Sequence, residues 1–305
     1  AVGQKGGFGE IAAYHRAKRD GRLPVRTWLT LLGDDGRSIV PDCYDAGLIS
    51  GTGDEMLMIG GVKLFLDGSA GGRTAWMTEP YLGEDKTTGV WMWEDAELER
   101  MVLDAHKKGY QLVCHAIGDA AIEQLITAYE KALAAFPDPD RRHRIEHCGF
   151  STPAQHERMV KAGIYPCPQQ VFIHDFGDAY VKVLGPERAL PSYPFRTWFD
   201  LGLKPATGSD APVCDPNPFP NFHAMLTRQT WKGTVMDERQ RVSIEEALQA
   251  YSQGIHAFHQ NRPQALPPEF HILGVQPGGA TGAVWEPEDS VGWALMMALD
   301  LGGNW

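Results

Sequence analysis

Hydrophobic and polar positions follow two alternating patterns along the chain. Short apolar segments, several of them apolar on both faces, alternate with longer segments in which apolar residues recur at spacings of three and four. The first pattern predicts strands buried under helices, and the second predicts amphipathic helices. Their alternation is typical of a parallel α/β fold. The predicted strands are Val25–Leu32, Gly61–Leu66, Tyr110–His115, His143–Cys148, Ile164–Gln169 and Leu203–Gly208.

The predicted helices have recognisable start and stop signals. Asp95 precedes an apolar stripe and is predicted to cap a helix, while Thr152 begins another helix that Gly163 ends. Ser243 and Glu246 form a capping box before a further helix. The apolar stripes of the first two predicted helices are Leu98, Met101, Val102 and Ala105, and then Ile122, Leu125, Ile126, Tyr129 and Leu133.

Six predicted strands with helices between them indicate a (β/α)8 barrel of the TIM type in which two strands are unaccounted for. Periodicity alone does not separate such a barrel from a doubly wound open sheet, so the open sheet remains the alternative. No internal repeat or linker divides the chain, and residues 1–260 are predicted to form one partial barrel. Residues 261–305 are rich in turn-forming residues without periodicity, which predicts an irregular C-terminal tail.

Composition places the chain among ordinary globular proteins. Its 305 residues and 33.7 kDa suffice for one large core, with 43% hydrophobic and 22% charged residues. A net charge of -11 argues against nucleic acid or an anionic membrane as a partner, and no apolar run reaches membrane-spanning length. Five cysteines without a CxxC pair, and no secretory signal, favour a cytoplasmic location. Self-association into a homo-oligomer is compatible with these features.

Four candidate metal ligands stand near the ends of different predicted strands. Side chains at the carboxyl ends of parallel barrel strands converge on one mouth, so Lys63, His115, His147 and Asp210 are expected to meet there. Imidazole and carboxylate groups suit zinc and similar divalent ions. Taken singly, each residue is weak evidence, because a lone His at a strand end is more often structural. Lys63 has no lone pair as an ammonium and ligates only if its amine is carboxylated.

These residues lie within four ordered motifs that together are more specific. The chain resembles the amidohydrolase superfamily, and most of all its YtcJ-like, amidohydrolase-3 branch, over roughly Val25 to Tyr251. The motifs are Val62–Ser69 with Arg73-Thr74-Ala75, then His115–Asp119, then His143–His147, and then Gly208–Val213.

The resemblance implies a metal-dependent hydrolase that cleaves an amide-like C–N bond, other than a peptide bond, in a small molecule. Lys63 would be a carboxylated bridging ligand, and His115 and His147 would ligate a second ion. Asp210 would ligate the first ion and act as general base. One or two divalent ions, most often zinc, serve this chemistry in the superfamily.

Further residues are assigned supporting roles. Arg73, Gln170 and His174 are predicted to contact the substrate. Three others adjoin the ligand histidines in the motifs and are predicted to orient them from outside the ligand set. They are Asp119, Glu146 and His143.

Two family features have no counterpart in these residues. The family's first barrel strand has a His-x-His pair, which occurs nowhere in the 305 residues, and a small β-sandwich normally flanks the barrel. We therefore expect a fragment that lacks the N-terminal part of the protein. Residues 261–305 are either a remnant of the sandwich, a divergent terminus or the product of a reading-frame change. The alternatives to an active hydrolase are an inactive fragment and a regulatory or scaffold protein that retains the barrel.

Overall fold

The computed structural model describes residues 7–33, 38–84, 86–138, 140–203 and 205–258. Its strands are parallel and follow each other in chain order, β1–β2 in one ladder and β3–β4–β5 in another. Single bridges from Val62 to Leu112 and from Phe65 to His115 connect the two ladders. The strands are β1 Thr27–Leu32, β2 Leu57–Lys63, β3 Val113–Ala116, β4 Arg144–His147 and β5 Tyr165–Cys167.

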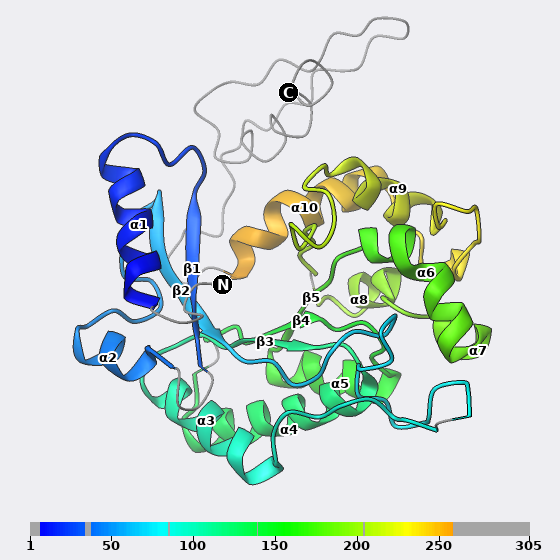
Figure 1. Ribbon diagram of the computed structural model, residues 1–305, viewed down its shortest axis with the longest axis horizontal. Coiled ribbons are helices and arrows are strands. Elements are labelled where there is room, and N and C mark those ends of the chain that lie inside the picture. Colours follow the sequence, from blue (N-terminus) through cyan, green and yellow to red (C-terminus); the bar gives the residue numbers. More distant parts are fainter. Residues whose placement is uncertain (1–6, 34–37, 85, 139, 204, 259–305) are drawn as a thin grey trace, which may run out of the picture.

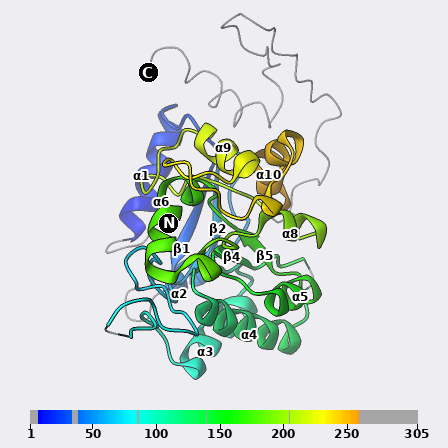
Figure 2. The same ribbon diagram turned by 90° about the vertical axis from the view of Figure 1, so that its right-hand side faces the viewer.

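Helices follow most of the strands and lie outside them. In both ribbon views α3, α4 and α5 lie along one side of β3–β5, and α9 and α10 lie across the strands from them (Figures 1 and 2). The helices are α1 Gly7–Arg19, α2 Val40–Asp45, α3 Asp95–Lys107, α4 Asp119–Ala135, α5 Pro153–Ala162, α6 Val171–Leu184, α7 Pro186–Ala189, α8 Phe195–Asp200, α9 Phe219–Thr227 and α10 Ile244–Phe258, with a 3-10 turn η1 at Glu238–Gln240.

This arrangement matches part of a TIM-type barrel. A doubly wound sheet reverses its strand order at a switch point, whereas the strands here keep chain order from β1 to β5. Consecutive parallel strands with helices on the outside are the repeating unit of a (β/α)8 barrel. The barrel interpretation is therefore preferred over the open sheet. The predicted tail, residues 261–305, lies outside the described residues.

One predicted strand is wrong. The described residues of Leu203–Gly208 form no ladder, although this segment runs beside β5. Its contacts there are limited to marginal bonds, such as Gly208 N–H to the Pro168 carbonyl at 3.4 Å. Pro205 and Pro168 both lack the backbone donor that a regular ladder needs. Proline thus breaks the hydrogen-bond pattern where apolar content had predicted a strand.

The helix ends largely follow their sequence signals. Thr152 and Gln155 form a reciprocal capping box at the start of α5, and Gly163 ends that helix in the left-handed region at φ 66°. Ser243 and Glu246 bond each other's backbone N–H before α10, as predicted. Asp95 is instead the first helical residue of α3, after Glu94. There its carboxylate still complements the helix dipole.

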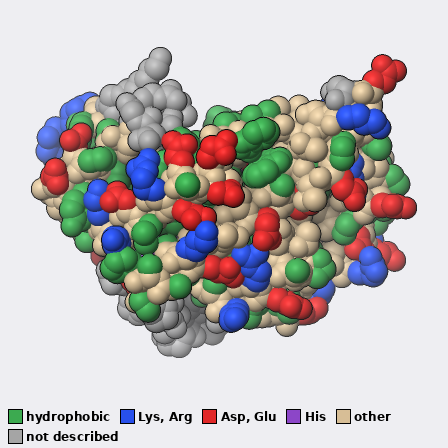
Figure 3. Space-filling view, turned by 90° about the horizontal axis from the view of Figure 1, so that it is seen from below, with side chains coloured by type: hydrophobic (Ala, Val, Ile, Leu, Met, Phe, Trp, Pro, Cys, Tyr) green, Lys and Arg blue, Asp and Glu red, His purple; other side chains and the backbone are tan. Residues whose placement is uncertain are grey.

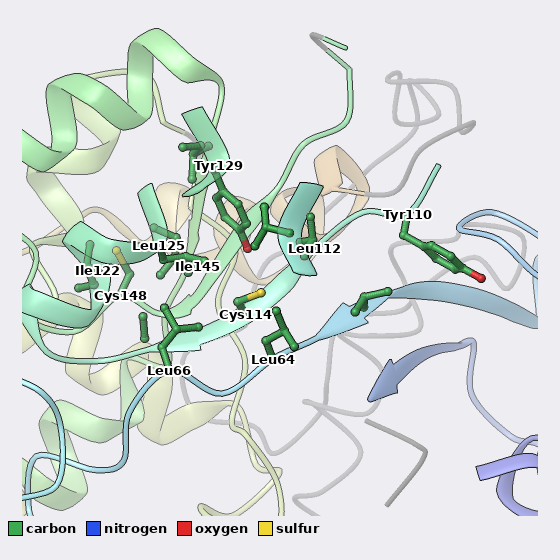
Figure 4. Packing of buried hydrophobic residues seen from close by; sticks show 14 of the residues in the cluster. Leu64, Leu66, Tyr110, Leu112, Cys114, Ile122, Leu125, Tyr129, Ile145 and Cys148 are labelled. Carbon is green, nitrogen blue, oxygen red and sulfur yellow. The ribbon is translucent and has the colours of Figure 1, made fainter. Parts of the chain in front are cut away.

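A continuous apolar core fixes which side chains of each strand face inward. Cys114 of β3 and Ile145 of β4 point toward Ile122, Leu125 and Tyr129 of α4, which are all fully buried (Figure 4). Because strand side chains alternate between faces, the neighbours Val113, His115, Arg144 and Glu146 point away from the helices. The core therefore directs those side chains into the barrel.

His143 lies at the opposite end of β4 from His147. Leu112 N–H donates to His143 Nδ1 at 3.0 Å, so the proton of the neutral ring is on Nε2. That Nε2 faces His106 Nδ1 at 3.0 Å, and His106 Nε2 donates to the Phe136 carbonyl at 2.7 Å. Burial and the neighbouring His106 and Arg141 hold the pKa of His143 well below its ordinary value. The chain of bonds ties the ends of α3 and α4 to the strands.

We expect stability to fall as pH decreases below about 6.5, partly through His156. Its ring is 2% exposed, Nδ1 has no hydrogen-bond partner among the described residues, and burial lowers its pKa from 6.5 to about 4. The unfolded state then binds the extra proton between these two pH values, so His156 alone costs up to roughly 3 kcal/mol by pH 4.

Urea unfolding between pH 7.5 and pH 4.5 tests this expectation. His156→Gln should flatten the decline in unfolding free energy with falling pH, whereas the exposed His15→Gln should leave the slope unchanged. A parallel decline in wild type and His156→Gln would exclude His156 as a source of acid sensitivity.

The face shown in Figure 3 has no single charged patch, although the chain is acidic overall. Over the face of Figure 3, acidic and basic side chains are interspersed with apolar ones. None of the described helices combines the length and apolar character needed to cross a membrane.

Candidate metal centre

A cavity of about 980 Å³ opens on the strand face turned away from α3–α5. Its walls comprise inward-facing side chains of β1–β4, the loop at 69–72, one face of α6 and the segment 210–213. All four predicted ligands line this cavity: Lys63, His115, His147 and Asp210. The fold thus brings together residues that are up to 147 positions apart in the chain, from 63 to 210.

His115 and His147 form the centre of this group. They stand at the ends of neighbouring strands, where the ladder pairs Ala116 with His147. Their ring centroids are 4.4 Å apart at an interplanar angle of 70°. His147 has φ 71°, so the chain turns out of β4 at this residue. The turn places its imidazole beside the last inward-facing side chain of β3.

Asp67 anchors His115. His115 Nε2 lies 3.2 Å from Asp67 Oδ1 and 3.0 Å from the Gly68 carbonyl. The Asp67 side chain is fully buried and accepts backbone N–H bonds from Trp76 at 2.9 Å and Gly118 at 2.8 Å. A bond from Ile117 N–H at 3.0 Å completes the set. With Nε2 used in this way, Nδ1 of His115 is left for a ligand.

His147 is anchored through its other nitrogen. Its Nδ1 lies 2.5 Å from Gln169 Oε1, and the Phe172 ring stacks on the imidazole at 5.6 Å and 13°. Burial lowers the pKa of His147 well below its ordinary value, and His115 and Lys63 lower it further. The ring is therefore neutral at pH 7, with Nδ1 as donor and Nε2 available to accept a cation.

Lys63 ends β2 within the cavity, half-buried, with Nζ 4.8 Å from the centre of the Phe65 ring. Burial lowers its pKa, while the negative charges of Glu146 and Asp210 oppose that shift. A lysine with a lowered pKa is more often a neutral amine, which is the reactive form of the side chain.

Asp210 stands at the rim of the cavity. The residue as a whole is exposed and has φ 56°. Desolvation of its carboxyl group raises the pKa, and the nearby Lys63 and His115 lower it in opposition. Its charge therefore interacts with the Lys–His group across the cavity.

The chemical types of these donor groups fit a divalent cation. Two imidazoles each keep one nitrogen in a protein hydrogen bond and one nitrogen for a ligand, and a carboxylate and an amine line the same space. Across the described part of the chain, however, no three His, Cys, Asp or Glu side chains already converge as a complete metal site. A cation bound by both histidines and Asp210 would thus require the Asp210 side chain to approach the pair.

Of the three residues predicted to support the histidines, only Glu146 lines the cavity. Its carboxylate pairs with Arg144 Nε at 2.9 Å. Asp119 begins α4 and accepts a bond from Thr78 N–H at 2.9 Å, away from both rings. His143 belongs to the buried pair with His106 at the far end of the strand.

The three predicted substrate contacts do not line the cavity. The Gln170 side chain is fully buried and bonds Arg228 and the Tyr193 carbonyl. His174 Nδ1 bonds Asp175 at 2.6 Å, and Arg73 lies 5.9 Å from the Tyr81 ring. The structure thus places all three outside the cavity lining, and their contact with a substrate stays a prediction.

A family model described as the amidohydrolase family matches residues 1–261. The chain belongs to this family. The match covers every predicted ligand and the whole described barrel, which agrees with the resemblance noted from the four motifs. The structural relatives of the chain share a TIM-barrel-like α/β fold.

Several known proteins are similar to this amidohydrolase chain. Protein LONG AFTER FAR-RED 3 of Arabidopsis thaliana is 33% identical over 82% of this chain and 42% of its own length. Putative amidohydrolase YtcJ of Bacillus subtilis is 29% identical over 81% of this chain and 46% of its own length. N-substituted formamide deformylase of Arthrobacter pascens is 25% identical over 78% and 44%. The chain thus spans less than half the length of these relatives.

Two solved structures agree with this assignment. Uncharacterized metal-dependent hydrolases from Pyrococcus furiosus and Pyrococcus horikoshii superpose with TM-scores of 0.69 and 0.71, at 29% and 27% identity. Each covers 81% of this chain and 49% of the solved chain.

A second family model, penicillin amidase, matches residues 221–305 and overlaps the first over residues 221–261. The described residues of the overlap pack into the barrel. Phe222, Met225, Val242 and Ala247 belong to the same buried cluster as the strands. Physically, α9 and the start of α10 are therefore part of the amidohydrolase barrel.

The predicted site residues did not include the two residues that contact His115 and His147 through their other ring nitrogens. Asp67 follows a predicted strand directly, and that position is a signal for a buried carboxylate at the mouth. Gln169 follows β5 by two residues. Positions such as Asp119 were predicted because they lie close to a histidine in the sequence. The sequence does not show which residues lie close to a histidine across neighbouring strands.

We expect Asp67→Asn to weaken the binding of a divalent metal ion by about 10–100-fold, because the amide neither holds the His115 ring as firmly nor increases its basicity. Chelator competition measures the affinity, and a thermal melt of the metal-free protein measures any general loss of folding. Asp119→Asn is the matched control, since that carboxylate contacts neither histidine. Equal affinities for wild type and Asp67→Asn, with both proteins folded, would contradict an orienting role.

Proposed function

We propose that the protein is a metal-dependent hydrolase that cleaves an amide-like C–N bond, other than a peptide bond, in a small molecule. One observation supports this most: the four residues selected from sequence motifs line a single cavity. The family match and the names of the metal-dependent hydrolase and deformylase relatives support the same chemistry. Because the chain spans about half of its relatives, the proposal concerns the activity of the whole protein.

The residues of this chain that would hold a cation are His115 through Nδ1, His147 through Nε2, and Asp210 through its carboxylate. A bound divalent ion, for which imidazole and carboxylate donors favour zinc, would supply acidification of water and polarisation of the substrate carbonyl. Asp67 and Gln169 orient the two imidazoles by binding the ring nitrogens that face away from the proposed cation. The hydrolysis also requires a group that accepts a proton from the attacking water.

Asp210 fits the role of proton acceptor and donor. Its carboxylate takes the proton of the attacking water as a C–O bond forms at the substrate carbonyl. It then gives that proton to the amide nitrogen as the C–N bond breaks, so the products are a carboxylic acid and an amine. A pKa raised by desolvation brings the carboxyl group closer to the basicity that this transfer needs.

Lys63 fits as a carboxylated ligand. The lowered pKa of its amine favours the neutral form, which attacks carbon dioxide and releases one proton to give a carbamate. The carbamate has one negative charge and two oxygen donors in place of an ammonium. Its place at the end of β2, within the cavity, suits it to share a cation with the histidines.

A second candidate is an inactive fragment or a scaffold protein. The observation in its favour is that, within the described residues, no three His, Cys, Asp or Glu side chains already form a complete metal site. Zinc binding by the 305-residue chain therefore separates the two candidates.

Equilibrium dialysis against zinc, followed by elemental analysis, tests the proposed site. We expect saturable binding that His115→Ala and His147→Ala each weaken by at least about 100-fold, because each removes one of few ligands. His15→Ala, an exposed histidine of α1, is the matched control. Binding that is absent, or that survives both substitutions, would exclude this site and favour the scaffold.

A further inference from the structure

One face of α6 presents aromatic rings to the cavity. Phe172, Phe176 and Tyr180 recur every fourth residue, and all three line the cavity wall. The centroids of Phe172 and Phe176 are 5.1 Å apart, and those of Phe176 and Tyr180 are 6.4 Å apart. The row begins at His147, on which Phe172 stacks. It therefore leads directly from the proposed reaction centre along the cavity.

The rings of this row are not equivalent. Phe172 and Tyr180 are 4% and 3% exposed and belong to the second buried cluster, so packing alone explains them. Phe176 is only half-buried and packs against that cluster from its edge. Two more apolar residues of the cavity are exposed: Phe65 at 37% and Val213 at 58%. These three side chains leave apolar surface in water without a structural need for it.

The charges of the cavity do not offer an anion a site along this row. Among the described residues, the lysine and arginine side chains that line the cavity are Lys63 and Arg144. Arg144 pairs with Glu146 at 2.9 Å, and Lys63 belongs to the proposed reaction centre. A negatively charged substituent beside Phe176 would thus lose its hydration without gaining a partner.

We propose that the substrate is an amide bearing an aromatic or branched alkyl group without a negative charge, which lies against Phe176, Phe65 and Val213 while the amide is held at the histidine pair. This inference rests on the proposed function, because it assigns the amide to the same cavity. Apolar surface fixed beside a small set of polar groups is the usual composition of a small-molecule site. In this proposal the row of rings contacts the substituent, and the histidine pair positions the amide bond.

Ligand-observed NMR titrations of the metal-free 305-residue chain test the inference without hydrolysis. The probes are benzamide, cyclohexanecarboxamide, acetamide and 4-carbamoylbenzoate. We expect the two cyclic amides to bind at least about tenfold more tightly than acetamide, because a hydrophobic pocket discriminates by the apolar groups that it buries. The added carboxylate of 4-carbamoylbenzoate should remove most of that advantage.

Substitutions test whether Phe176 causes the preference for benzamide over acetamide. Phe176→Ala should reduce the benzamide-to-acetamide ratio at least severalfold, while Phe176→Leu should retain most of it. Phe219→Ala removes a ring that is 46% exposed and outside the cavity, and should leave the ratio unchanged. Circular dichroism and a thermal melt confirm that each variant is folded.

An unchanged ratio in folded Phe176→Ala, or tighter binding of 4-carbamoylbenzoate than of benzamide, would overturn the inference. Because the readout is binding, its failure differs from failure of the proposed function. A retained apolar preference in a protein that hydrolyses no amide would overturn only the hydrolase proposal.

Discussion

Replacement of Asp210 by Asn is expected to lower the turnover of amide hydrolysis by about 10²–10⁴-fold. The Asn oxygen still offers a lone pair to a cation, so binding of the ion should persist in weakened form. The amide does not accept a proton at neutral pH, and both the attack of water and the departure of the amine then lack their proton carrier. The loss should appear in kcat, with a smaller change in KM.

The measurement needs turnover and metal content on the same preparation of the whole protein. Asp215→Asn is the matched control, because Asp215 is an exposed carboxylate close in the same segment and does not line the cavity. Normal turnover in Asp210→Asn with full metal content would remove Asp210 from the mechanism and leave water activation to another group.

The sequence predicted which residues meet at the cavity better than it predicted the residues around them. Lys63, His115, His147 and Asp210 were expected at one mouth, and they line one cavity. For the first three this follows from the strands, because parallel strands align their carboxyl ends regardless of distance along the chain. Asp210 reaches the cavity on a segment whose described residues form no strand. Whether the four jointly bind a cation remains a prediction.

The residues that orient the ligands depend on side-chain directions that periodicity does not encode. His143 and His147 are four residues apart on one short strand, yet they stand at its opposite ends and belong to unrelated networks. Asp67 reaches His115 across 48 positions of sequence. A sequence motif contains residues that are close along the chain. The hydrogen-bond partners of a side chain depend instead on how the loops between strands pack.

The strand predictions failed where backbone chemistry opposed the apolar pattern. Ile164–Gln169 was expected as one strand, and the structure keeps only Tyr165–Cys167 between Ile164 and Pro168. Leu203–Gly208, which contains Pro205, forms no strand in its described residues. Side-chain hydrophobicity predicted burial correctly at Ile164, Leu203 and Ala206, but burial alone does not supply N–H donors to a ladder.

Arg228→Met is expected to destabilise the protein by about 3–5 kcal/mol, the largest effect that we predict for a residue outside the metal centre. Arg228 is fully buried, and burial lowers the pKa of its guanidinium to about 9, so the group stays charged at pH 7. No carboxylate of the described residues lies within ion-pairing distance of it. Its charge is therefore stabilised by direct hydrogen bonds to neutral acceptors, with the Asp237 carboxylate contributing from a greater distance.

Those acceptors account for all five donors of the guanidinium. Nε donates to the Met236 carbonyl at 2.8 Å. Nη1 donates to Tyr193 and Gln170, at 3.0 and 3.3 Å, and Nη2 donates to Ser192 and Leu190, at 2.6 and 3.3 Å. Methionine reaches only about as far as Nε of the arginine and leaves these oxygens buried without donors. Replacing only one side of a satisfied polar network costs more than replacing both sides with apolar groups.

Urea unfolding at pH 7 measures the loss, with Arg239→Met as control because the Arg239 side chain is 83% exposed and should change stability by less than about 0.5 kcal/mol. Arg228→Lys should lie between wild type and Arg228→Met, since it retains a charge but only three donors. Gln170 connects this network to the neighbouring Gln169, which orients His147. A tolerated Arg228→Met would mean that the carbonyl oxygens find water instead, and that the loop behind His147 is held by packing alone.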